Sequence, residues 1–125
     1  MNHLKARKLA KSVDTTSDIL YELSMDVDSS IRILVAAHLN TSLETLEKLS
    51  KDLDSSTRWA VANNPNASIE ISERLSKDKI YYVRRKVVKH PNTTIEILKS
   101  LLNDEECSDS ALKVLIKRKG LILLA

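Results

Sequence analysis

A repeat of fixed length runs through most of the sequence. Aspartates stand at positions 26, 52, 78 and 104, and the intervals 52−26, 78−52 and 104−78 are all 26 residues. The three units superpose without a gap: DVDSSIRILVAAHLNTSLETLEKLSK, DLDSSTRWAVANNPNASIEISERLSK and DKIYYVRRKVVKHPNTTIEILKSLLN. Self-similarity at a period of this length is typical of stacked helical repeats, in which each unit buries its apolar face against its neighbours.

The repeat predicts how a single domain over 1–125 is divided. Three full repeats cover 26–51, 52–77 and 78–103. Residues 9–25 match the second half of a unit and predict an N-terminal cap, while 104–125 match a degenerate first half and predict a C-terminal cap. His3 is expected to lie in a tail before the first cap.

Each unit is expected to hold two short helices. The first begins near Asp28 in the first unit, where the D-S-S segment provides a cap and a turn. The second begins after an asparagine that all three units share. There we predict capping boxes of the T-x-x-E type, formed by Thr41 with Glu44 and by Thr93 with Glu96.

Apolar spacing and composition predict an all-α fold with an aliphatic core. Ile31 and Val35 are four residues apart, and Leu43, Leu46 and Leu49 recur every three residues, so each helix has one apolar stripe. Aromatic residues make up only 3% of the chain and phenylalanine is absent. The single glycine argues against a β fold, whose tight turns usually need several.

The shared pattern D-x5-R-x2-V-A-x-N/H-x-N-T/A-x-L/I resembles the leucine-rich repeat variant family and, more broadly, short HEAT-like helical repeats. The resemblance covers nearly the whole chain. It implies a right-handed α-solenoid of paired short helices and a scaffold rather than a reaction. One type in the family has an iron–sulfur cluster on an added group of cysteines, and the single Cys107 means that this feature is not inherited.

Aspartates and arginines that recur in register are interpreted as a structural ladder. Arg32, Arg58 and Arg84 each follow a repeat aspartate by six residues. A row of arginines could bind phosphates, but pairing with aspartates of the same or the adjacent repeat is favoured, because an unpaired charge at a repeat junction would be costly. His38 and His90 share one repeat position, where hydrogen bonding in the inter-helix turn is favoured over metal binding.

The remaining residue patterns argue against an enzyme, a metal site or a cofactor. The repeated serines are expected to cap helices, and no glycine-rich phosphate loop can form around Gly120 alone. Cys107 is flanked by Glu105, Glu106 and Asp109, whose charges disfavour the thiolate. A single cysteine fits a reducing compartment, and no apolar run is long enough for a bilayer, so we expect a cytoplasmic protein without a membrane partner.

The segment DKIYYVRRKVVKH, residues 78–90, breaks the repeat with two tyrosines and five basic residues. Arg85 and Lys89 are four apart and share a helix face, and Trp59 stands one repeat before Arg85. Because packed helices lie about 8–10 Å apart, these residues should gather in one patch. The predicted aromatic–basic patch comprises Trp59, Asn63, Tyr82, Arg85, Lys86 and Lys89.

Charge supports the interpretation of this patch as a binding surface. The third unit has six basic and two acidic residues, whereas each of the first two has three basic and four acidic. Localised charge steers association even though the net charge of the chain is only +3. The alternative is a solvated helix face, with Trp59 covering an apolar seam.

The sequence favours a protein partner with an acidic surface, since Trp, Tyr and Arg are typical of interface hot spots. Binding of a nucleic-acid backbone by Arg85, Lys86 and Lys89, with Lys117 and Arg118, is the alternative. We expect a monomer. The apolar tail at 121–124 is expected to cap the last repeat; a dimer contact or a membrane-surface contact is less favoured.

Overall fold

The computed structural model describes residues 2–119, and all regular elements in that range are helices. The prediction of an all-α chain is confirmed for this range. The apolar tail at 121–124 lies outside the described residues. The helices are α1 (His3–Lys11), α2 (Ser17–Leu23), α3 (Ser29–Ala37), α4 (Leu43–Leu49), α5 (Ser55–Asn63), α6 (Ile69–Leu75), α7 (Tyr81–Val88), α8 (Ile95–Leu101) and α9 (Ser108–Lys119).

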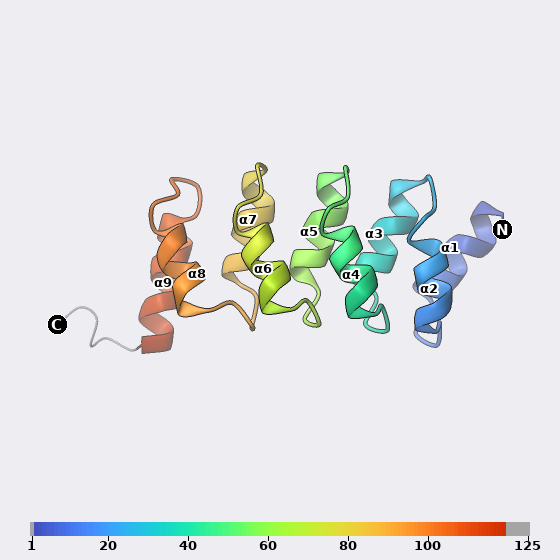
Figure 1. The fold of residues 1–125 in the computed structure, drawn as a ribbon, viewed down its shortest axis with the longest axis horizontal. Coiled ribbons are helices and arrows are strands. Elements are labelled where there is room, and N and C mark those ends of the chain that lie inside the picture. Colours follow the sequence, from blue (N-terminus) through green and yellow to red (C-terminus); the bar gives the residue numbers. More distant parts are fainter. Residues whose placement is uncertain (1, 120–125) are drawn as a thin grey trace.

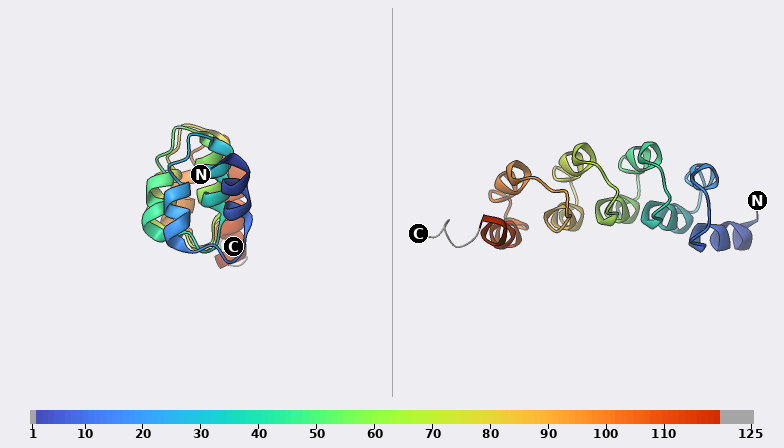
Figure 2. Two further views of the ribbon diagram at one scale, coloured as in Figure 1. Left: turned by 90° about the vertical axis from the view of Figure 1, so that its right-hand side faces the viewer. Right: turned by 90° about the horizontal axis from the view of Figure 1, so that it is seen from below.

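The helices form a row of pairs in two layers, with α1 and α9 at opposite ends (Figure 1). The odd-numbered helices make up one layer, in which each contacts the next along the row. The even-numbered helices make up the second layer (Figure 2). Seen along the helices, the row bows gently, and the odd-numbered layer lies on its inner side (Figure 2).

In the first two units the first helix begins where the repeated aspartate predicts it, and in the third the N-cap is Ile80, which makes no side-chain cap bond. Asp28 and Asp54 are the N-caps of α3 and α5, and their side chains accept hydrogen bonds from the backbone amides of Ser30 and Thr57. Pro65 comes directly after the C-cap of α5, where it prevents the helix from continuing. The D-S-S prediction is therefore confirmed.

The predicted capping boxes are wrong by one residue. The N-caps of α4 and α8 are Ser42 and Thr94, which accept from the amides of Thr45 and Ile97. Thr41 is instead buried, and its hydroxyl donates to a carbonyl of α3 at 2.6 Å. Because Thr41 is buried, the next hydroxyl along the chain caps the helix.

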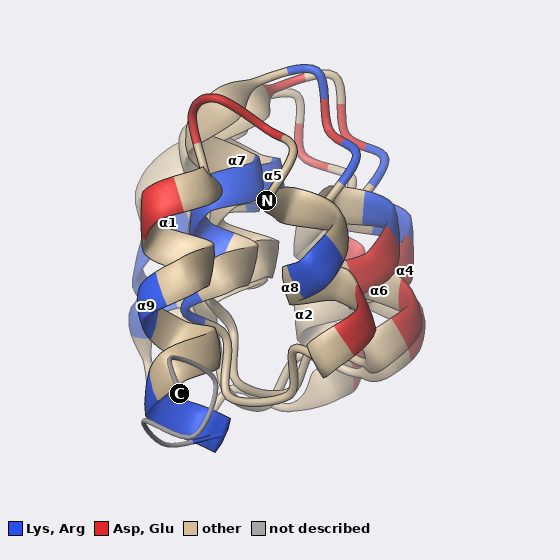
Figure 3. Cartoon of the chain, turned by 90° about the vertical axis from the view of Figure 1, so that its left-hand side faces the viewer, with Lys and Arg blue, Asp and Glu red and all other residues tan. Residues whose placement is uncertain are grey.

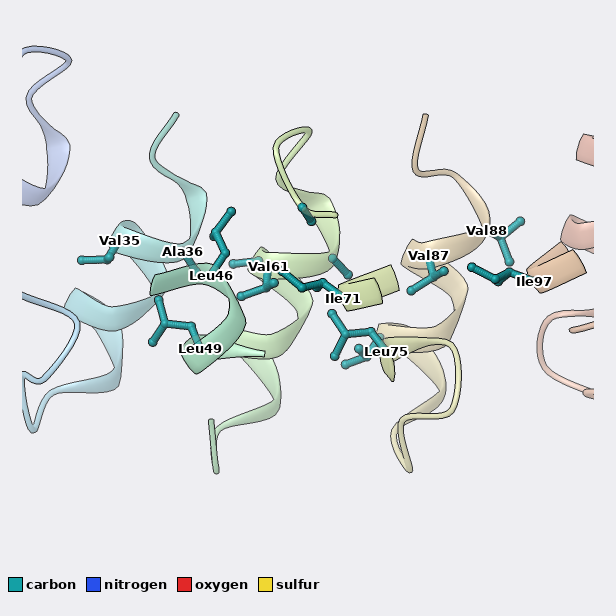
Figure 4. Close-up of a cluster of buried hydrophobic side chains, with 14 of the residues drawn as sticks. Val35, Ala36, Leu46, Leu49, Val61, Ile71, Leu75, Val87, Val88 and Ile97 are labelled. Carbon is teal, nitrogen blue, oxygen red and sulfur yellow. The ribbon is translucent and has the colours of Figure 1, made fainter. Parts of the chain in front are cut away.

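One cluster of buried side chains, mostly aliphatic, runs from α1 to α9. Figure 4 shows its middle part, from α3 to α8. Ile31, Val35, Leu46 and Leu49 are at most 1% exposed, as their spacing predicts. Leu43 is 52% exposed, so this end of the predicted stripe is wrong. Each three-residue step falls about 60° short of a full helical turn, which rotates Leu43 away from the face of Leu49.

The helix α1 was not predicted. Residues before position 9 were expected to form a tail, yet α1 begins at His3 and is capped by Asn2, whose side chain accepts from the amide of Lys5 at 2.8 Å. Ala6 and Ala10, four residues apart, are buried against the rest of the core. The N-terminal end of the inner layer is therefore one helix longer than the repeat indicates.

Candidate binding face

The three arginines of the repeat pair with aspartates of the following unit. Arg32 Nε lies 2.8 Å from Asp52, Arg58 Nε 2.7 Å from Asp78, and Arg84 Nε 2.5 Å from Asp104. A second nitrogen of each guanidinium donates to the carbonyl of the aspartate that opens its own unit. The hydrogen bond to Asp78 raises the pKa of Arg58. This Asp–Arg ladder confirms the structural interpretation.

A second ladder crosses the turns at the opposite ends of the helices. His38 Nδ1 accepts from the amide of Asn40 at 2.9 Å, so Nε2 has the proton and donates to the carbonyl of Ser12 at 2.6 Å. Asn64 donates to the carbonyl of His38 at 3.1 Å, and His90 Nε2 lies 2.8 Å from the carbonyl of Asn64. Turn hydrogen bonding, as predicted for the histidines, is confirmed.

Five of the six residues of the aromatic–basic patch line one hollow. It lies between α5 and α7 on the inner layer and encloses about 180 Å³. Its lining residues are Trp59, Tyr82, Arg85, Lys86 and Lys89. The sixth, Asn63, is the exposed last residue of α5 and is not among the lining residues.

Two of the three cations of this hollow rest on aromatic rings. Lys86 Nζ lies 5.2 Å from the centre of the Trp59 ring, and Arg85 Cζ lies 5.1 Å from the centre of the Tyr81 ring. Tyr81 meets Tyr82 edge to face, with ring centres 5.7 Å apart. The Tyr82 hydroxyl is hydrogen-bonded to the hydroxyl of Ser55. These contacts hold the long side chains in defined positions, which reduces the entropy lost when a ligand binds.

Acidic residues of the next loop approach one edge of the patch. Arg85 donates to the carbonyl of Glu106 at 3.3 Å, and its guanidinium lies 3.8 Å from the Glu106 carboxylate. Both side chains are about half exposed, so water screens the pair. Lys86 and Lys89 form no ion pair at 4 Å or less with an acidic group in residues 2–119.

Charge is segregated between the two layers. The odd-numbered helices hold 13 of the 20 Lys and Arg residues of the chain and a single acidic residue, Asp109. The even-numbered helices hold seven acidic residues and three basic ones. Figure 3 shows basic bands on α7 and α9 at one side and acidic bands on α4 and α6 at the other. The net charge of +3 conceals this separation.

Within residues 2–119 no group of three or more His, Cys, Asp or Glu side chains could hold a metal ion, and no helix there is long and apolar enough to cross a membrane. Cys107 is buried, and burial together with the charge of Asp104 raises the pKa of its thiol. Burial, rather than the flanking glutamates, is the main cause.

Three contributors to the patch were missed from the sequence: Tyr81, Ser55 and Glu106. Tyr81 is four residues before Arg85, so its place beneath that guanidinium could have been recognised from helical spacing. The two others come from neighbouring units and required the structure. Comparison of the chain with protein-family models, curated proteins and solved structures found no match.

Proposed function

We propose that this chain is a non-enzymatic binding module that recognises an acidic surface of another protein through the inner layer. The observation that supports it best is the gathering of five predicted patch residues around one hollow between α5 and α7. Aromatic residues and arginine at such a position are typical of interface hot spots. The module works as a cytoplasmic monomer and needs no cofactor.

The fold proposed with this function is a right-handed HEAT-like α-solenoid related to leucine-rich repeat variants. The alternation of two layers and the side-by-side contacts of the odd-numbered helices support it. Stacked repeats create an extended inner surface on which partners bind. The patch lies on that surface, whereas the Asp–Arg ladder joins arginines near the start of α3, α5 and α7 to aspartates in the loop before the next odd-numbered helix.

A protein partner fits the contacts better than a nucleic acid does. Lys86 lies over Trp59 and Arg85 over Tyr81, so a base could stack on these faces only by displacing a cation. In the middle of the layer, Arg32 and Arg58 are held by aspartates. The basic residues therefore do not form the continuous track that a phosphate backbone requires.

Binding of a nucleic-acid backbone is the second candidate, because of the 13 basic residues in one layer. Under it, Arg85, Lys86, Lys89 and Lys117 contact phosphates. Arg118 contributes less, because it donates to the carbonyls of Thr93 and His90. About four such contacts predict a log–log salt slope near −3.6.

A titration that follows Trp59 emission tests both candidates. The probes are poly-L-glutamate and single- and double-stranded 20-nucleotide DNA and RNA, each at several salt concentrations. The variant K86E/K89E is compared with K113E/K119E, which makes the same charge change on α9 outside the hollow. We expect poly-L-glutamate to change the emission saturably, and K86E/K89E to weaken binding at least tenfold more than the control does.

Two outcomes would contradict the proposal. Equal losses in the two double variants would mean that charge in general, and not the hollow, binds the probe. Saturable binding of DNA or RNA with the steep salt slope, and none of poly-L-glutamate, would establish the second candidate instead.

A further inference from the structure

The inner layer has a second hollow, two helices before the first. It lies between α1 and α3, encloses about 410 Å³ and is larger than the hollow at α5 and α7. Its lining is mostly aliphatic, with the charged Lys11 and the polar His38 and Asn40. The residues that matter for its chemistry are Ala10, Lys11, Val13, Leu34, Ala37 and Leu39.

Repeat register places both hollows on the same face. Leu34 and Ala37 occupy the unit positions of Lys86 and Lys89, because 86−34 and 89−37 both equal 52, which is two repeats. The same backbone positions therefore line an apolar hollow near one end of the layer and a basic hollow near the other. The position of Ala37 and Lys89 is exposed in all three units, so the core does not require the difference there. The position of Leu34 and Lys86 is partly exposed in these two units and is a buried alanine, Ala60, in the second.

The apolar hollow is bordered by large side chains that remain in contact with water. Val13 is 81% exposed and Leu39 63% exposed. Covering both would remove apolar area from water, which is favourable by about 25 cal/mol per Å². Lys11 at the rim adds a positive charge, so the occupant again meets a cation, as it does at Lys86 and Lys89.

We propose that the partner is an extended polypeptide segment that fills both hollows at once, with a large aliphatic side chain at α1/α3 and an acidic residue at α5/α7. This rests on the proposed function and names the chemistry of its ligand. Two helix spacings separate the hollows, about 16–20 Å. An extended chain covers that distance in about five or six residues.

Selection from a random 16-residue peptide library displayed on phage tests this inference, with the whole chain immobilised. We expect enriched peptides to have an acidic residue five or six positions from Leu, Ile, Met or Phe. The variant L34K removes the apolar hollow, and A37K serves as a second variant. The repeat tolerates lysine at both positions, since Lys86 and Lys89 occupy them in the third unit. Circular dichroism checks that both variants fold.

The selected peptides are then synthesised and their affinities measured. L34K is expected to weaken binding of these peptides at least tenfold. It should not change the affinity of peptides in which the aliphatic residue is replaced by serine. Enriched peptides that are acidic but lack the aliphatic residue, or unchanged affinity in L34K and A37K, would overturn this inference while leaving the proposed function intact. If K86E/K89E enriched the same peptides, or if no peptide were enriched at all, both this inference and the proposed function would be overturned.

Discussion

The Asp–Arg ladder joins α3, α5 and α7 each to the loop before the next odd-numbered helix. The same units also form the outer face, which is the solvent-exposed side of the odd-numbered helices. The two regions differ in how their residues vary from unit to unit. At the ladder, each of the three arginines makes the same two kinds of contact, to an aspartate of the next unit and to a carbonyl of its own. On the outer face, one exposed position is Ala37, then Asn63, then Lys89.

Comparison of the units with one another therefore distinguishes residues that stabilise the fold from residues that are available for binding. Where the three units need the same packing contact, they use the same side chains. Where the side chain is free of packing, it changes from unit to unit, and two of the variants line hollows. If this division is correct, changes at the ladder affect stability, and changes on the outer face affect binding.

The largest expected effect is at the centre of the ladder. Arg58 is 8% exposed and pairs with Asp78, so Arg58→Ala leaves a buried carboxylate without its partner. Such losses cost about 3–5 kcal/mol. Urea unfolding followed by circular dichroism measures this. The matched control Arg85→Ala, in the half-exposed pair with Glu106, should change the free energy of unfolding by less than about 0.5 kcal/mol. Similar costs in both would refute the division.

The pH dependence of the ladder comes next. Burial alone would raise the pKa of Asp104, but hydrogen bonds from Arg84 and from backbone amides hold it below its usual 3.8. The folded carboxylate therefore contributes stability above pH 3.8, and this contribution is lost as the pH falls toward the lower folded value. Asp104→Asn should cost about 1–3 kcal/mol at pH 7, and its difference from the wild type should shrink below pH 4. A constant difference from pH 7 to pH 3 would contradict this.

The ladder, the helix pairs and five residues of the aromatic–basic patch could be predicted because each depends on the repeat period. A residue at a fixed position in a stacked unit must lie beside its equivalent one helix away. The period does not specify whether an arginine pairs with the aspartate of its own unit or with that of the next. The pairing of Arg84 with Asp104 was therefore found only in the structure.

The larger hollow at α1 and α3 could not be predicted for a related reason. Three of its eight lining residues, Ala10, Lys11 and Val13, come from α1 and the segment after it, where no full repeat unit is recognised. The prediction of the capping boxes was wrong because T-x-x-E and the S-x-x-T that starts one residue later both fit the turn before the helix. Burial of the first hydroxyl residue decides between them, since Thr41 and Thr93 are 4% and 3% exposed and the next residue caps the helix in both units.

A smaller effect is expected in the buried turns, where two threonines occupy the same repeat position. The Thr41 hydroxyl donates to the Val35 carbonyl, whereas the equivalent Thr93 hydroxyl is buried without a partner in the described part of the chain. The second unit has Ala67 at this position, so a methyl group is tolerated. We expect Thr41→Ala to cost about 1 kcal/mol and Thr93→Ala to be neutral or stabilising in thermal unfolding. Equal costs would show that the Thr93 hydroxyl is satisfied in solution.

The smallest expected effect lies on the outer face, at the contact between Arg85 and Glu106. The Glu106 carboxylate, 3.8 Å from the guanidinium, occupies a position that an acidic partner would need, so it competes with the partner for Arg85. Because exposed pairs contribute about 0.2–1 kcal/mol, Glu106→Gln should strengthen binding of poly-L-glutamate by up to about fivefold and leave stability almost unchanged.

The matched control is Glu105→Gln, which removes the same charge one residue from the contact. A gain that is equal in the two variants would reflect the overall field of the loop, and a gain confined to Glu106→Gln would identify Arg85 as a direct contact of the ligand. No gain in either variant would place the ligand away from Arg85. Recognition would then rest on Lys86 and Lys89, the two lysines of the hollow.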